Sequence, residues 1–251
     1  MPVEFDGSTD ALGDDGWTSV TAAPLTMACW ITPDTTDYRI IMALSDYDFA
    51  GNFALSQHNQ SSGSLLAETY QASGDVYANS LSSGTVTANT MMHAAAVFTS
   101  ASSRTVYADG VAGLTNTDTV TPAGITGISV GTLFSFDAPF TYFDGTVAHA
   151  ALWNVALTQA EVTALASGVS PLLIRPSALR FYAPFDAHTV DVMGNATLSD
   201  TGTPTIATTE QPAIIRPSAQ ILQFPSSGGA APGGSPTTTV IPRYYRQLMA
   251  G

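Results

Sequence analysis

Two stretches of the chain, residues 92–111 and residues 143–168, constrain the fold more than any others. The first contains two apolar runs, residues 93–98 and 104–108, and the second run leads directly into Asp109-Gly110 and Val111. Asp-Gly tolerates positive φ at both central positions of a type I′ turn, and the twist of that turn matches the twist of paired strands. The first stretch therefore predicts a β-hairpin that turns at Asp109-Gly110.

The second stretch predicts a strand followed by one short helix. The strand begins near Phe143-Asp-Gly145 and ends in Trp153-Asn154. Thr158 and Glu161 have the spacing of a capping box, and Leu157 is placed to pack on Val162. Gly168 stands where a left-handed residue usually ends a helix. The prediction is a strand, an N-cap at Thr158 and a helix that ends before Gly168.

This order of hairpin, strand and capped helix resembles the laminin-G-like, concanavalin A-like lectin/glucanase jelly roll. Residues 3–7 resemble its opening strand, and Leu25–Pro33 resembles its second strand. The resemblance implies an all-β fold: an antiparallel β-sandwich with one short helix, a mostly β C-terminal extension and a flexible tail. Because this fold supports many functions, the function has to be argued from sites.

Composition divides the chain into three parts. Residues 1–168 are expected to form the laminin-G-like sandwich, and residues 169–225 a β extension packed on it. Residues 226–251 combine a Gly/Pro/Ser linker with a C-terminal docking peptide. The sequence Ile-Arg-Pro-Ser-Ala occurs at residues 174–178 and again at 215–219. The two copies indicate either matching edge turns or matching partner contacts.

Charge and cysteine content limit the partners and the cross-links expected of the chain. Only 11% of residues are charged, and the net charge is −13. This charge argues against nucleic acid and against an anionic membrane as partners. The single Cys29 lies in an apolar run and is expected to be a buried thiol. We find no signal-peptide pattern at the N-terminus and no apolar run of transmembrane length.

Residues typical of catalysis are sparse. A retaining glycosidase needs two carboxylates about 5 Å apart. Among the glutamates only Glu4 has an acidic residue, Asp6, at the alternating position, and the resemblance assigns Asp6 a structural role. The histidines are far apart in sequence, and His93 and His149 lie in apolar strand runs. We therefore expect a protein that is not an enzyme. Asp109 and Asp144 each precede glycine, and we interpret both as turn residues.

Calcium is the one cofactor that the resemblance suggests, because related sandwiches often hold a calcium ion at the rim. The weak candidates for ligands are four carboxylates near the second and third strands: Asp34, Asp37, Asp46 and Asp48. The alternative is a solvated loop without an ion. We predict no other cofactor.

An unusually aromatic loop supplies candidates for glycan contact. Aromatic rings stack on sugar rings, and this loop contains Phe134, Phe136, Phe140 and Tyr142. A second group of rings that could serve the same role lies near the acidic residues: Tyr38, Tyr47 and Phe49. The alternative is local packing of these rings within the sandwich.

The C-terminal tail indicates a docking function. After the linker come residues of the types that anchor interfaces: Ile241, Arg243, Tyr244, Tyr245, Arg246 and Leu248. The alternatives are a strand that folds back on its own domain and a frayed end. Residues 170–185 also resemble the continuation seen in phage proteins that carry such domains.

Two functional hypotheses follow from these observations. The first is a non-enzymatic structural protein of a bacteriophage virion, such as a capsid decoration or a head or tail fibre component. Its partners would be other virion proteins, either copies of itself or a capsid or tail neighbour, and it would be extracellular after lysis. The second is a lectin-like carbohydrate-binding module for adsorption to host-surface glycans.

Overall fold

The computed structural model describes residues 2–46, 48, 50–59, 63–133, 141–185, 190–208 and 212–215. The described residues belong to one compact unit, which spans residues 1–215. In this part of the chain, no helix has the length and apolar character needed to cross a lipid bilayer.

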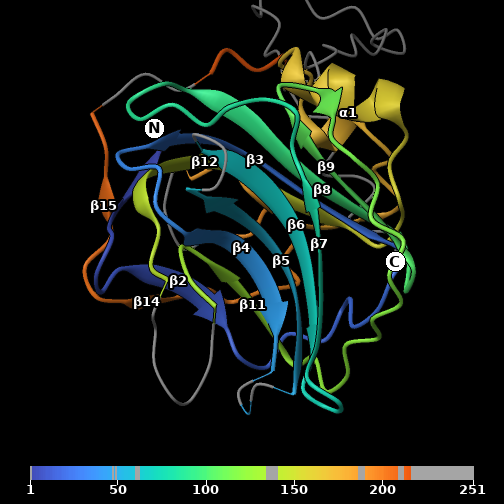
Figure 1. Cartoon of the computed structure of the whole chain (residues 1–251). Helices are drawn as coiled ribbons and strands as arrows, with labels where there is room; N and C mark the ends of the chain where they lie inside the picture. Colours follow the sequence, from blue (N-terminus) through green and yellow to red (C-terminus); the bar gives the residue numbers. More distant parts are fainter. Residues whose placement is uncertain are drawn as a thin grey trace, which may run out of the picture. The chain divides into compact units, whose positions relative to one another are not determined.

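Two antiparallel sheets form the body of the molecule (Figure 1). In the eight-stranded sheet the order is β10-β9-β8-β3-β12-β1-β15, and β13 also pairs with β12. Its strands are β1 (Val3–Asp6), β3 (Leu25–Pro33), β8 (Met92–Ser100), β9 (Ser103–Ala108), β10 (Val111–Ala112), β12 (Asp144–Trp153), β13 (Leu179–Ala183) and β15 (Thr205–Ile206).

The second sheet has seven strands in the order β14-β2-β11-β4-β5-β6-β7. These strands are β2 (Ala11–Asp14), β4 (Arg39–Ser45), β5 (Gly51–His58), β6 (Ser64–Gln71), β7 (Val76–Leu81), β11 (Gly127–Val130) and β14 (Ser199–Thr201). Strands β13, β14 and β15 come from the segment after residue 168, so this segment adds strands to both sheets.

The main hydrophobic core lies between the two sheets. Phe5 packs edge-on against Phe143 with ring centroids 6.4 Å apart, and Phe53 packs against Phe98 at 5.2 Å. Cys29 is buried in this core, and burial raises the pKa of its thiol. The structure confirms the predicted antiparallel β-sandwich and the buried cysteine.

The predicted hairpin is confirmed. Val111 on β10 pairs with Ala108 on β9, and the turn between them is Asp109-Gly110. Both turn residues have positive φ, 48° at Asp109 and 77° at Gly110. A Cβ atom at Gly110 would lie 3.1 Å from the Cα of Thr163, so glycine also lets the turn approach the helix closely.

The predicted helix is confirmed as α1 (Gln159–Ala166). The Thr158 side chain accepts from the backbone N–H of Glu161, and the Glu161 carboxylate accepts from the backbone N–H of Thr158 at 2.8 Å. Gly168 follows with a φ of 86°. A short 3₁₀ helix, η2 (Pro171–Leu173), comes next.

A second hydrophobic cluster covers part of the outer face of the eight-stranded sheet. Ala28, Ala95 and Ala151 form its base on β3, β8 and β12. Val162 and Leu165 from α1 pack onto these small residues, which leave room for the helix. Figure 1 shows α1 on the side of β8 and β9. This cluster extends the core beyond the sandwich.

The interpretation of Asp144 as a turn residue is wrong. Asp144 is the first residue of β12 and pairs with Asp6 on β1. Gly145 follows because the strands approach closely here: its φ is 129°, and a Cβ atom would lie 2.2 Å from the carbonyl oxygen of Thr32. The Asp-Gly pair therefore serves strand packing at this position and does not reverse the chain.

Candidate functional site

The outer face of the seven-stranded sheet carries a cluster of aromatic and polar side chains, which we call the Glu68 face: Tyr38, His58, Glu68, Tyr70, Tyr77 and Asn79. Leu65 and Ala67 on β6 belong to the core, so the alternating Glu68 and Tyr70 point outward. Across the β6–β7 pair, Glu68 stands opposite Asn79 and Tyr70 opposite Tyr77. The cluster therefore follows from strand register.

Glu68 is a buried carboxyl group at the centre of this face. Its side chain is only 2% exposed, and the Tyr38 hydroxyl donates to Glu68 Oε2 at 2.9 Å. Glu68 Oε1 makes no hydrogen bond with any residue that the structure describes. Burial raises the pKa of Glu68, and the nearby hydroxyls of Tyr77, Tyr38 and Ser56 offset part of that shift. The carboxyl group thus lies beneath the surface of the face, where it accepts from the Tyr38 hydroxyl.

Two tyrosines flank this carboxyl group at different depths. Tyr77 is 49% exposed, whereas Tyr38 is half-buried and packs against His58 with ring centroids 5.4 Å apart. Burial, together with the carboxyl group of Glu68, raises the pKa of both phenols. Both therefore remain hydrogen-bond donors at neutral pH, and Tyr77 presents a ring to solvent.

Small residues continue the Glu68 face towards the centre of the sheet. Ala54 pairs with Glu68, Ala43 pairs with Ala54, and Ser129 pairs with Ala43. Tyr38 and Leu133 pack against this row. The chain therefore reaches the face at Leu133, immediately before the aromatic loop predicted for glycan contact.

That loop is only partly described. Phe134, Phe136 and Phe140 lie outside the described residues, so their predicted role stays a prediction. Tyr142 is half-buried, and burial together with the carboxylates of Asp6 and Asp10 raises the pKa of its phenol. It neighbours the β1–β2 turn.

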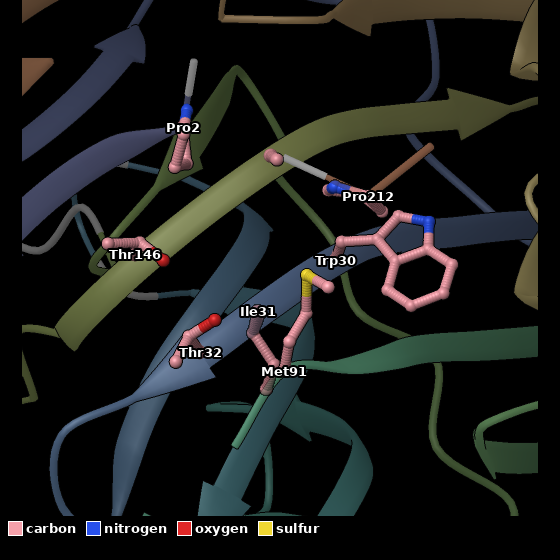
Figure 2. A pocket seen from close by; sticks show the side chains of 8 residues that line it. Pro2, Trp30, Ile31, Thr32, Met91, Thr146 and Pro212 are labelled. Atoms are coloured by element: carbon pink, nitrogen blue, oxygen red, sulfur yellow. The ribbon is translucent and has the colours of Figure 1, made fainter. Parts of the chain in front are cut away.

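A small pocket lies on the opposite side of the molecule, on the outer face of the eight-stranded sheet (Figure 2). Trp30 lies at one end, beside Met91 and Pro212, and the hydroxyls of Thr32 and Thr146 lie at the other. The pocket has a volume of about 10 Å³, room for about one water molecule. We call it the Trp30 pocket.

A second cavity of about 10 Å³ lies on the other side of Trp30, beneath α1. His93 and His149 line it, and the Trp30 indole packs edge-on against His93 at 5.4 Å. His149 Nδ1 lies 2.9 Å from the Tyr182 hydroxyl. Burial lowers the pKa of His93 to about 3, so this imidazole is neutral at ordinary pH.

The four predicted calcium ligands form two pairs rather than one group. Asp34 and Asp37 precede β4, and Asp37 lies 4.0 Å from Arg39. Asp46 and Asp48 follow β4, and Asp46 accepts from the backbone N–H of Gly51 at 3.1 Å. Seven strand residues span about 20 Å. The described part of the chain contains no group of three His, Cys, Asp or Glu side chains placed to hold a metal ion.

The six tail residues predicted to dock onto a partner, Ile241, Arg243, Tyr244, Tyr245, Arg246 and Leu248, lie outside the described residues. Their role therefore stays a prediction. Of the Glu68 face, in contrast, only Tyr38 was named from the sequence, and the rest was missed. The available signal was the alternation of Leu66, Glu68 and Tyr70 on one side of a strand.

Comparison with solved structures places the fold. A heptameric SAP-like pentraxin from Limulus polyphemus matches with a TM-score of 0.58 and 14% identity, over 80% of this chain and 94% of that chain. A putative carbohydrate-binding protein from Bacteroides ovatus matches with a TM-score of 0.60 and 17% identity, over 86% of this chain and 63% of that one, less than two thirds of its length.

The sialidase CBM40 of Ruminococcus gnavus, bound to α2,3-sialyllactose, matches with a TM-score of 0.51 and 11% identity, over 66% of this chain and 98% of that chain. At these identities the matches establish the fold. None of the curated proteins compared with the chain matches it in sequence. The family model described as the concanavalin A-like lectin/glucanases superfamily matches residues 6–163, and the chain belongs to this family.

Proposed function

We propose that this protein is a non-catalytic carbohydrate-binding module and that it takes its glycan on the Glu68 face. The observation that carries the proposal is a half-exposed Tyr77 ring beside the exposed Asn79 amide, over a buried carboxyl group that holds the Tyr38 hydroxyl. The B. ovatus neighbour is called a putative carbohydrate-binding protein, and the R. gnavus neighbour holds sialyllactose. Both support a glycan as the class of ligand.

The chemistry of the face suits a sugar. The Tyr77 ring can stack against the apolar C–H face of a pyranose, and neighbouring polar groups can bond its hydroxyls. The hydroxyl oxygens of Tyr77 and Tyr38 can accept, and the exposed Asn79 amide can both donate and accept. A ring to stack on, together with donors and acceptors around it, is what sugar recognition requires.

The same face supports binding without catalysis. Glycoside hydrolysis by the usual mechanisms requires two carboxyl groups on either side of the scissile bond. Glu68 is the only acidic residue in β4, β5, β6 and β7. A lone carboxyl group held by a tyrosine hydroxyl serves better as a hydrogen-bond acceptor than as half of a catalytic pair.

The test is a titration of immobilised glycans followed by calorimetry on the best ligand. Replacing Tyr77 with Ala should weaken binding by about 30-fold, as expected for loss of an aromatic anchor worth about 2 kcal/mol. Trp30→Ala is the matched control, because it removes an aromatic ring from the opposite face and should change the affinity less than about two-fold. The reverse result would move the site to the Trp30 pocket.

We further propose that the protein acts within a bacteriophage particle, where such a module would serve adsorption. The support is the sequence of the tail, in which Tyr and Arg residues follow a Gly/Pro/Ser linker. Deleting Thr239–Gly251 should leave the sandwich folded and abolish co-sedimentation with particles in a density gradient. Full retention of the shortened chain on particles would contradict the docking role of the tail.

A further inference from the structure

Each arginine of the described chain makes at least one hydrogen bond within the protein. The sequence contains no lysine, so arginine is the only strong cation. Arg104 has no exposed surface and donates to the carbonyl oxygens of Ala101 and Asp118. It lies on β9, in the sheet opposite the Glu68 face, and a ligand cannot reach it.

Two further arginines lie over the eight-stranded sheet. Arg175 Nε is 2.6 Å from the Glu161 carboxylate, which stabilises the start of α1. Arg180 donates to the carbonyl oxygens of Ser177 and Leu179, at 3.0 and 3.3 Å. Both follow α1 in the chain and are remote from β6 and β7.

Arg39 is the one arginine in the strands that form the Glu68 face. Its guanidinium lies 4.0 Å from the Asp37 carboxylate and donates to the carbonyl oxygen of Tyr38 at 3.3 Å. Burial and the carboxylate of Asp34 raise the pKa of the nearby Asp144, and Arg39 offsets part of that shift. Arg39 is therefore already surrounded by negative and carbonyl oxygens.

Recognition of an acidic sugar usually requires a cation. A carboxylate or sulfate that leaves water needs charge-assisted hydrogen bonds, and arginine supplies them best because its planar fork matches the anion. The exposed polar groups of the Glu68 face are phenols and an amide instead, and the carboxyl group of Glu68 lies buried beneath them. The net charge of −13 adds long-range repulsion of an anion.

We propose that the Glu68 face selects glycans that carry no anionic group and rejects sialylated, uronic or sulfated ones. This inference rests on the proposed function, and it separates the protein from its sialyllactose-bound structural neighbour. Glu68 reinforces the choice, because its carboxyl group lies beneath the face and, when ionised, repels an anion placed over it.

The experiment uses the full chain and matched pairs of oligosaccharides, each pair differing only in a terminal sialic acid or a sulfate. Calorimetry should show that the neutral member binds at least 10-fold more tightly in every pair that binds. Equal or tighter binding of the acidic members would overturn the selectivity and leave glycan binding intact. If neither member of any pair binds, both the selectivity and the proposed function fail.

A gain-of-function variant tests whether the missing cation is the cause. Asn79 is exposed and stands opposite Glu68, so the E68Q/N79R double variant places a guanidinium on the face without an acidic partner to neutralise it. Compared with E68Q alone, it should bind the acidic members at least 10-fold more tightly. If the added arginine leaves their affinity unchanged, the cation argument is wrong. A circular dichroism melt of both variants shows whether the sandwich remains folded.

Discussion

The outer faces of the two sheets differ in what their side chains permit. The outer face of the eight-stranded sheet presents Ala28, Ala95 and Ala151, and a helix packs directly onto them. On the outer face of the seven-stranded sheet, Tyr38 and Leu133 pack on the small residues Ala43 and Ala54, but β6 and β7 present Tyr70 and Tyr77, and Tyr77 is half-exposed. Small side chains on a sheet leave room for a covering layer, whereas large amphipathic rings leave an exposed surface that a ligand can contact.

Under the proposed function, one face stabilises the fold and the other binds the ligand. The covered face gains stability because α1 and residues 169–182 remove its apolar surface from water. The Glu68 face keeps a buried carboxyl group, and burying such a group costs stability unless it is fully hydrogen-bonded. A buried carboxyl group with a raised pKa is what we expect beneath the proposed binding site.

The largest effect is expected on the covered face, at Trp153. Its ring is fully buried, and its Nε1–H donates to the carbonyl oxygen of Ile174 at 2.8 Å. Trp153→Ala should lower the free energy of unfolding by about 3–5 kcal/mol in urea titrations. Trp153→Phe keeps most of the packing but removes the hydrogen bond. The missing hydrogen bond should cost about 1 kcal/mol in addition to the cost of the lost side-chain volume. A loss below 1 kcal/mol for the alanine variant would show that this layer is not a core.

The two local features that the sequence predicted are now seen to touch. The Gln159 side chain donates to the Gly110 carbonyl oxygen, and so does the Thr163 hydroxyl at 3.3 Å. The hairpin and the helix could each be predicted because a turn or a cap depends on residues within four positions. Their contact could not, because it joins residues about 50 positions apart and depends on how the whole sheet folds.

The Glu68 face was missed for the same reason. The Tyr38–Glu68 hydrogen bond spans 30 residues, and the positions of Tyr77 and Asn79 depend on the β6–β7 register. The opposite case is a pair of residues that are close in the sequence but far apart in the structure. Asp37 and Asp46 are nine positions apart, and a strand holds them at its opposite ends.

The next largest effect concerns the free-energy cost of burying the carboxyl group of Glu68. Because the pKa of Glu68 is raised above its unfolded value of 4.5, the folded state keeps the proton to higher pH. The free energy of unfolding should therefore fall as the pH rises above 4.5 and through the folded-state pKa. Glu68→Gln removes this loss, and we expect it to be more stable than the wild type by about 1–2 kcal/mol at pH 8.

The control for this prediction has the opposite sign. Burial acts to raise the pKa of Glu161, but hydrogen bonds from Arg175 and Thr158 outweigh it and lower that pKa. The folding stability that Glu161 contributes is therefore present above pH 4.5 and lost on acidification. Glu161→Gln should therefore destabilise the protein at pH 8. Urea titrations at pH 4, 6 and 8 compare the two variants. The same sign for both at pH 8 would contradict the contrast between the two faces.

The smallest effect concerns the helix that covers the eight-stranded sheet. The Thr158 hydroxyl caps α1 and belongs to a capping box with Glu161, whose carboxylate also holds Arg175. Thr158→Ala should cost about 1 kcal/mol of unfolding free energy, whereas Thr158→Ser keeps the oxygen and should cost only a few tenths. Glycan affinity should stay within about two-fold of the wild type in both, because the helix and the Glu68 face lie on opposite sheets. A cap variant that weakened glycan binding ten-fold would mean that the covering layer also shapes the ligand site. The proposal that one face is structural and the other binds the ligand would then be wrong.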